Sequence, residues 1–310
     1  MVDIIIPAYN AHKTIERTLF SILYQENLDK INTYIINDGS TKGYSDLVKF
    51  FSNFMTIKEI TLDENKGPAV ARQCGINCSK SEYIIFIDSD DVFYNSYAVK
   101  KLLDEISTKN YDIVVSNFIE ETTDGFIEHN NDTIWLHGKI YKRKFLNENK
   151  IAFNDSRANE DNGFNQLLFL HEPRAIFIDE KTYIWCKNNM SITRKNNYEY
   201  RLQGLEGYVY NINWAIETAS SHSCNYTKIA RLAYRSLIAM YCYFLEFKYL
   251  KLIKLSKILK EKSELYPLDD NQKLEIMENQ LQFMYNNNTR RYLLNASITF
   301  NTFLEEIDKI

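Results

Sequence analysis

The 310-residue sequence has few cysteines, and they form no recognisable pairing or metal-binding motif. Its five cysteines are an odd number and no CxxC pair occurs, which argues against a disulfide framework and against a structural zinc site. Cys74 and Cys78 lie four residues apart, but no nearby histidine or third cysteine completes a ligand set, so buried packing is the simpler interpretation. We therefore expect reduced thiols, as in a cytoplasmic protein.

Long apolar runs and an excess of basic residues are also missing. No stretch of about 20 apolar residues occurs, so no segment is predicted to span a membrane. The N-terminus, MVDIIIPAYN, has neither the basic stretch nor the long apolar segment of a secretory signal. The formal net charge is −4, so no broad basic surface is predicted and nucleic acid is not an expected partner.

What the sequence does have is the composition of a globular protein, with strand and helix patterns alternating over residues 2–117. Hydrophobic residues make up 45% and charged residues 25%. The predicted strands are 2–6, 33–37, 55–62, 83–87 and 112–116, and the predicted helices are 14–24, 47–54, 68–78 and 96–108. This alternation predicts an α/β fold, a doubly wound and mostly parallel sheet with right-handed crossovers.

Beyond residue 197 the pattern changes to long helices, and glycine is nearly absent after Gly207. We expect residues 1–199 to form the α/β domain and residues 200–310 a separate helical domain, which could serve acceptor binding, self-association or contact with a membrane surface. The basic segment 248–262 could lie on an anionic membrane. Its helical wheel separates leucine from lysine only in part, which favours a packed helix with solvated lysine heads.

Three polar clusters follow predicted strands: Pro7–Asn10, Asp38–Ser40 and Asp88–Asp91. Ligands of doubly wound sheets bind outside the carboxyl ends of the strands, so we expect the clusters to converge on one crevice. Asp88 and Asp90 point to the same side of an extended chain, and such a pair can hold Mg²⁺ or Mn²⁺. The alternative is a solvated turn in which Asp90 or Asp91 caps the next helix.

Four segments in order resemble the N-terminal half of family-2 glycosyltransferases with the GT-A fold: IIIPAYN, INDGST, NKGPAVARQCGI and IIFIDSDD. The resemblance covers about residues 2–117 and continues more weakly to about residue 195 through HGKIYKR, NEDNGFN and NNMSITR. It implies an inverting enzyme that uses Mn²⁺ or Mg²⁺ and moves a sugar from a nucleotide-diphosphate donor, with UDP as the expected nucleotide. It also implies a glycan acceptor, such as a cell-surface polysaccharide or a teichoic-acid-like polymer, and a cytoplasmic location with peripheral membrane contact as an open alternative.

The resemblance further implies which residues bind the donor. Asp38 would accept hydrogen bonds from the base or ribose, and its alternative is an Asx turn. Arg72 would lie near the diphosphate, and an exposed helical arginine paired with a nearby acid is the alternative. Asp88 and Asp90 match the family's DXD motif, with Asp90 as direct metal ligand and Asp88 contacting the ribose, or the metal through water. The full donor set is Pro7, Ala8, Tyr9, Asp38, Lys66, Arg72, Asp88, Ser89, Asp90, Ser191 and Arg194.

The segment NEDNGFN resembles the part of the family that carries the catalytic base. Asp161 would take the proton from the acceptor hydroxyl, and Glu160 beside it would lie on the acceptor side. Asn159 followed by two acids also fits the start of a helix, and both interpretations can hold. Trp135 and His137 are implied for the acceptor site, with core packing as the alternative for each.

Two other classes of protein compete with this interpretation. A nucleotidyltransferase needs a glycine-rich loop after the first strand, and IPAYNAHKT contains no glycine. A non-catalytic nucleotide-sugar or glycan-binding module of the same fold stays open as the alternative. The presence of Asp38, Asp88, Asp90 and Asp161 together favours the enzyme.

Overall fold

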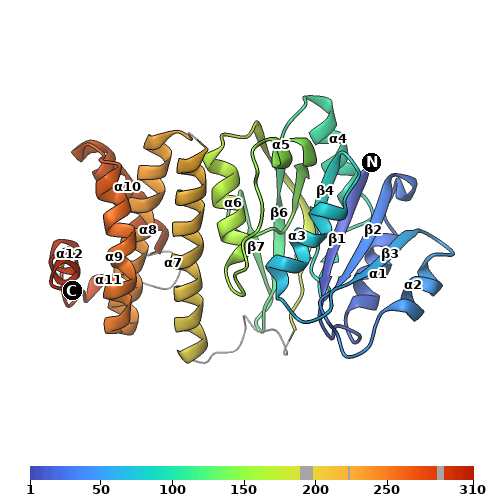
Figure 1. Ribbon diagram of the computed structural model, residues 1–310, viewed down its shortest axis with the longest axis horizontal. Helices are drawn as coiled ribbons and strands as arrows, with labels where there is room; N and C mark the ends of the chain where they lie inside the picture. The colour runs from blue at the N-terminus through green and yellow to red at the C-terminus, as the bar shows by residue number, and fades with distance from the viewer. Residues whose placement is uncertain (189–197, 223, 285–289) are drawn as a thin grey trace. The chain divides into compact units, whose positions relative to one another are not determined.

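The computed structural model describes residues 1–188, 198–222, 224–284 and 290–310 (Figure 1). The chain divides into two compact units, Met1–Arg201 and Leu202–Ile310. The first unit is a sheet flanked by helices, and the second is built from helices.

The first unit is organised around a nine-stranded sheet with the order β3-β2-β1-β4-β8-β6-β9-β5, in which β7 pairs with β6. Six strands run in one direction, and β5, β7 and β8 run against them. The strands are β1 (Val2–Ala8), β2 (Ile31–Asn37), β3 (Thr56–Thr61), β4 (Tyr83–Phe86), β5 (Val92–Phe93), β6 (Ile113–Glu121), β7 (Phe126–His129), β8 (Lys139–Lys142) and β9 (Ala175–Trp185). The predicted mostly parallel α/β fold is confirmed.

Helices connect and cover these strands. They are α1 (Ile15–Leu23), the 3₁₀ helix η1 (Leu28–Lys30), α2 (Ser45–Phe51), α3 (Pro68–Cys78), α4 (Ala98–Thr108), α5 (Arg143–Glu148) and α6 (Glu160–Leu170). α3 starts at Pro68, whose fixed φ and missing N–H suit the first turn of a helix. Gly75 lets α3 pack closely on β1, since a Cβ added there would lie 2.4 Å from Cγ2 of Ile5.

The sheet topology positions the polar clusters. β1 pairs in parallel with both β2 and β4, so these three strands end at the same edge of the sheet. Tyr9, Asp38 and Asp88 follow the three strand ends and are therefore brought to one edge from distant parts of the sequence.

The second unit contains α8 (Tyr226–Phe247), α9 (Leu250–Leu265), α10 (Asp270–Met284), α11 (Arg290–Leu294) and α12 (Phe300–Asp308), and most of α7 (Tyr198–Ser221). Figure 1 shows α8, α9 and α10 as long neighbouring helices. None of the described helices is long and apolar enough to cross a membrane.

α9 contains most of the basic segment and is packed within this unit. Leu252, Ile253 and Leu259 are buried. Three of its lysines form ion pairs with neighbouring helices: Lys251 with Glu206, Lys260 with Asp308 and Lys262 with Glu217. The apolar side of α9 is thus used for packing, and its lysine heads lie among acidic partners.

Candidate active site

The aspartates that follow β4 are held in place by α1. Arg17 donates from Nη2 to the main-chain oxygen of Asp90 (2.6 Å), and Thr18 donates from Oγ1 to the main-chain oxygen of Asp91 (2.7 Å). These two bonds fix the backbone of the acidic loop and leave its carboxylates available for other partners.

Asp91 anchors the same loop to β9. It is buried, with an exposed fraction of 1%. Its Oδ2 accepts a hydrogen bond from the hydroxyl of Tyr183 (2.5 Å), and its Oδ1 accepts one from the backbone N–H of Cys186 (2.8 Å). Burial and the nearby charges of Asp88 and Asp90 raise the pKa of Asp91. Neither Asp90 nor Asp91 caps the following helix, because α4 begins only at Ala98.

Arg72 joins the acidic loop to the start of α6. Its buried guanidinium donates from Nη2 to Asp88 Oδ1 and from Nη1 to Glu160 Oε1, both at 2.6 Å. Burial alone would lower the pKa of Arg72 and raise that of Asp88, but their mutual attraction outweighs burial and keeps both charged. Three elements distant in sequence are therefore tied together by one buried cation.

Asp161 lies next to this bridge, in the first turn of α6. Its Oδ1 accepts a hydrogen bond from the backbone N–H of Asn162 (2.8 Å). Burial and the negative charge of Glu160 raise the pKa of Asp161 to about 8, although Arg72 opposes the shift. A carboxyl group with a raised pKa is a stronger base than an ordinary aspartate, which suits proton transfer near neutral pH.

His137 lies within a cluster of aromatic rings. Its imidazole stacks on Tyr183 (ring centroids 4.6 Å apart), meets the edge of Phe118 (5.0 Å) and lies parallel to Trp135 (6.1 Å). Burial lowers the pKa of His137, so the ring is neutral at pH 7. The next residue must be glycine: Gly138 has φ +63°, and a Cβ there would lie 2.7 Å from Ser116 Oγ.

Asp88, Asp91 and His137 form a group that could hold a cation. Each offers a ligand atom, and these atoms lie within 4.8 Å of one another. Nε2 of His137 is 4.0 Å from Asp88 Oδ2, and its buried Nδ1 has no hydrogen-bond partner among the described residues. Carboxylate oxygens with a neutral imidazole suit Mn²⁺, so the residues fit a divalent cation.

Asp90, the predicted direct ligand, is outside that group within the described part of the chain. Its Oδ2 accepts a hydrogen bond from Nδ2 of Asn188 (2.8 Å). Burial and the charge of Asp88 raise the pKa of Asp90. Asp90 is thus a partly buried carboxylate that Asn188 and the charge of Arg17 stabilise, in the same loop as the potential cation site.

Asp38 fixes the loop that precedes α3. Its Oδ1 accepts from the backbone N–H of Lys66 (2.8 Å), and its Oδ2 accepts from that of Gly67 (2.9 Å). These bonds reach 28 and 29 residues along the chain, so Asp38 links two loops at the sheet edge rather than closing a local Asx turn.

The other predicted residues are spread around this centre. Tyr9 is exposed after β1, and the exposed Lys66 has its Nζ 3.8 Å from Glu64 Oε1. Pro7, Ser89 and Trp135 are half-buried, and Ala8 is buried. Ser191 and Arg194 lie outside the described residues.

The sequence did not predict that Arg17, Thr18 and Tyr183 hold the acidic loop, or that Asp91 anchors this loop to β9. For Arg17 and Thr18 the sequence contains a weak signal, because both lie on the first helix after the IPAYN segment and therefore near the predicted site. None exists for Tyr183, because it is 92 residues from Asp91 and lies in a segment without clear periodicity.

Comparison with known proteins identifies the family. The model of "Glycosyl transferase family 2" matches residues 3–159, which is half of the chain. The chain belongs to glycosyltransferase family 2.

Several curated relatives are glycosyltransferases. EpsJ of Bacillus subtilis is 27% identical over 62% of this chain and 63% of its own length. GlyA of Streptococcus pneumoniae is 25% identical over 62% of this chain and 31% of its own length. TarS of Staphylococcus aureus, a poly(ribitol-phosphate) β-N-acetylglucosaminyltransferase, is 24% identical over 59% of this chain and 35% of its own length. The matched region thus spans less than two thirds of each of these relatives.

Solved structures agree on the fold. TarS residues 1–349 in complex with UDP-GlcNAc give a TM-score of 0.63 at 16% identity and cover 91% of each chain. A mannosyltransferase from Pyrobaculum calidifontis, in complex with GDP-Man and Mn²⁺, gives 0.57 at 14% identity and covers 99% of this chain and 85% of that one. These likenesses confirm the predicted GT-A fold.

Proposed function

We propose that the protein is an inverting glycosyltransferase that moves a sugar from a UDP-sugar to a hydroxyl of a cell-surface polysaccharide or teichoic-acid-like polymer. One observation carries the proposal: the buried bridge from Asp88 through Arg72 to Glu160 sets Asp161 beside the acidic loop. The family of the chain supports the reaction class. The UDP-GlcNAc complex of TarS supports the nucleotide and a hexosyl or N-acetylhexosaminyl donor.

Asp161 acts as the general base in this proposal. Its carboxylate takes the proton from the acceptor hydroxyl as that oxygen attacks the anomeric carbon, and the bond from that carbon to the nucleotide diphosphate breaks. The raised pKa makes Asp161 a better proton acceptor than a solvated aspartate. Arg72 keeps Glu160 and Asp88 in place, and Trp135 borders the acceptor.

A Mn²⁺ or Mg²⁺ ion would be held by Asp88 and His137, whose ligand atoms form one group with those of Asp91, and Asp90 of the same loop is the further ligand that the DXD resemblance implies. When bound, it supplies positive charge that stabilises the departing diphosphate. His137 offers a neutral imidazole with a buried nitrogen that lacks a hydrogen-bond partner in the described structure. Asp91 belongs to the same group, and its oxygens can bind an ion in addition to the hydrogen bonds from Tyr183 and Cys186 that hold it in place.

The remaining donor residues come from the sheet edge. Pro7, Ala8 and Tyr9 border the base, and Ser89 lies in the acidic loop. Asp38 holds the backbone of Lys66 and Gly67, so it shapes the donor pocket by fixing that loop as well as through its own oxygens.

The proposal is tested by measuring UDP release and sugar transfer from UDP-sugars, with Asp161→Asn as the variant. Loss of a general base predicts a rate about 10²- to 10⁴-fold lower, with nucleotide binding retained. Asp104→Asn is the matched control, because Asp104 is exposed on α4, and it should transfer at the wild-type rate. Normal transfer by Asp161→Asn would remove Asp161 as the base. Binding of UDP-sugar without turnover by the wild type would favour the non-catalytic module.

A further inference from the structure

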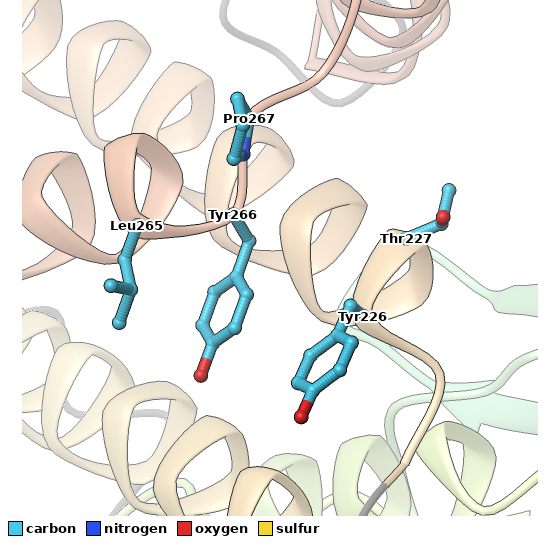
Figure 2. A pocket seen from close by; sticks show the side chains of 5 residues that line it. All are labelled: Tyr226, Thr227, Leu265, Tyr266 and Pro267. Carbon is cyan, nitrogen blue, oxygen red and sulfur yellow. The ribbon is translucent and has the colours of Figure 1, made fainter.

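The helical unit contains a cleft that the proposed reaction does not use. It has a volume of about 500 Å³ and is lined by Tyr226, Thr227, Leu265, Tyr266 and Pro267 (Figure 2). All five residues belong to the second compact unit. The volume lies within the range of small-molecule sites, about 300 to 1,000 Å³.

Two tyrosine rings dominate the cleft. The rings of Tyr226 and Tyr266 lie 5.6 Å apart and nearly parallel, with an angle of 16° between their planes. The hydroxyl of Tyr266 donates to Ser220 Oγ (2.9 Å), which holds that ring in place. Tyr226 and Leu265 are 61% and 64% exposed, although both carry large apolar surface. Figure 2 shows these three side chains next to one another and pointing the same way, with the phenol oxygens at their tips.

The backbone around the cleft is well defined by helix ends. Asn225 caps α8 by accepting hydrogen bonds at Oδ1 from the backbone N–H groups of Thr227 (3.0 Å) and Lys228 (3.4 Å). Tyr226 is therefore the first residue of a capped helix, and Tyr266 directly follows the last residue of α9. Rings placed on rigid elements lose little freedom when a ligand binds.

The chemistry of the lining restricts the ligand. The five lining residues include no aspartate, glutamate, lysine, arginine or histidine, so the lining offers no counter-charge to a phosphate or to a cation. It offers flat apolar surface with hydroxyl groups at the edge. A pyranose ring has the complementary pattern, with C–H groups on its faces and hydroxyl groups around its rim. Tyrosine presents such an amphipathic surface at low entropic cost.

We propose that this cleft binds an uncharged sugar unit of the acceptor glycan, separately from the sugar hydroxyl that reacts. The assignment to the acceptor rests on the proposed function, whereas sugar binding by the cleft does not. The reaction would then have a second point of contact with a long acceptor, which raises the affinity for polymer over a short glycoside.

Sugar binding is tested on the full chain by saturation-transfer NMR, without nucleotide or divalent metal. The probes are methyl β-glucopyranoside and methyl N-acetyl-β-glucosaminide, each at about 10 mM. A binding free energy of about 4 kcal/mol corresponds to a Kd of about 1 mM, so this concentration is about ten times the expected Kd. We expect signal on the ring protons of at least one probe. Loss of one stacking ring should weaken binding about two- to tenfold in Tyr226→Ala, and Tyr226→Phe should keep most of it.

Matched controls separate the cleft from other exposed surfaces. Tyr24→Ala removes an exposed ring directly after α1 (72% exposed) and should bind like the wild type. Leu265→Ala should weaken binding, whereas Leu274→Ala on α10 (55% exposed) should not. The leucine pair also serves as a second test if Tyr226→Ala folds poorly.

Absence of signal for both probes with the wild type would overturn the inference, and so would equal signals from wild type, Tyr226→Ala and Leu265→Ala. UDP binding in the presence of Mn²⁺ is measured in parallel. Because all the proposed donor residues belong to the first unit and the cleft to the second, loss of UDP binding marks a failed donor site and loss of sugar signal marks a failed cleft.

Discussion

At the scale of single residues, the buried Asp161 lowers the free energy of unfolding near neutral pH, which is a cost to the folded protein. Its folded-state pKa of about 8 lies above its ordinary value of 3.8, because burial and Glu160 favour the neutral form. The folded protein therefore holds a proton that the unfolded chain has lost over the range between these two values. Stability must fall as the pH rises through that range, in the direction opposite to that of a salt-bridged aspartate.

This cost predicts that Asp161→Asn is more stable than the wild type. Asparagine mimics the neutral carboxyl group, so its advantage should grow between about pH 5 and about pH 9 and reach about 1 to 3 kcal/mol. Urea unfolding at both pH values, in EDTA, measures it. An advantage that does not change with pH, or a less stable variant, would contradict the assigned pKa.

Arg72 makes a second prediction at this scale. Replacing Arg72 by Met leaves Glu160 buried and Asp88 half-buried without their cation, which should destabilise the fold by about 2 to 4 kcal/mol. The comparison is Arg231→Met, which breaks an exposed arginine–glutamate pair with Glu275 and should change stability by less than about 1 kcal/mol. Equal denaturant midpoints for the two variants would show that the Arg72 bridge contributes no more to stability than an exposed ion pair.

At the scale of elements, the sequence predicted the first half of the sheet well and the second half poorly. The helix predicted over residues 68–78 is α3 with the same bounds, because Pro68 and the apolar spacing mark it locally. β5 is only two residues long, and the pairing of β6 with β9 contains irregular register around Asn117. Such pairings depend on distant partners, and no periodicity in one strand can reveal them.

One junction between elements rests on a buried charge. Asp3 on β1 accepts hydrogen bonds from Ser79 Oγ (2.6 Å), from Ser81 Oγ (2.6 Å) and from the backbone of Lys80 (2.7 Å), and so ties β1 to the turn between α3 and β4. Burial alone would raise the pKa of Asp3, but the hydrogen bonds from Ser79, Ser81 and Asn32 outweigh it and lower the pKa.

Asp3→Asn should therefore cost about 2 to 3 kcal/mol at neutral pH. A depressed folded-state pKa gives stability that is present above pH 3.8 and is lost as the pH falls below it, so the gap between variant and wild type should narrow in acid. Unfolding followed by circular dichroism at about pH 7 and about pH 3.5 tests this, with the exposed Asp29→Asn as control. A gap that widens in acid would contradict the assigned network.

At the scale of the whole molecule, the candidate site is made of local motifs and long-range contacts in about equal measure. The acidic loop and Asp161 could be predicted, because each lies in a short segment with a recognisable pattern. The bridge of Arg72 could not, since its partners are 16 and 88 residues away along the chain. The acceptor role that the resemblance implies for His137 stays a prediction, and the structure adds a contact that the sequence did not indicate, with Nε2 4.0 Å from Asp88 Oδ2 where the chain turns at Gly138 into β8.

The division of the chain into two compact units predicts that donor binding and the other functions lie in separate units. We propose that residues 1–201 hold the whole donor site, and that residues 202–310 serve acceptor recognition, self-association or contact with a membrane surface. A fragment ending at Arg201 should then bind UDP with Mn²⁺ within about threefold of the full chain, which is under about 0.7 kcal/mol. Calorimetry on both proteins measures this, and a folded fragment that has lost UDP binding would place part of the donor site in the second unit.

A metal-dependent nucleotide site at the sheet edge is tested most directly by a thermal-shift screen. UDP, GDP, CDP and dTDP are each added with Mn²⁺ and with EDTA to the wild type and to Asp90→Asn. A ligand that binds only the folded state raises the melting temperature by mass action. We expect UDP with Mn²⁺ to raise the melting temperature, UDP in EDTA to raise it little, and Asp90→Asn to show a smaller shift than the wild type. Stabilisation by none of the four nucleotides, or an equal shift in EDTA, would contradict a metal-dependent nucleotide site.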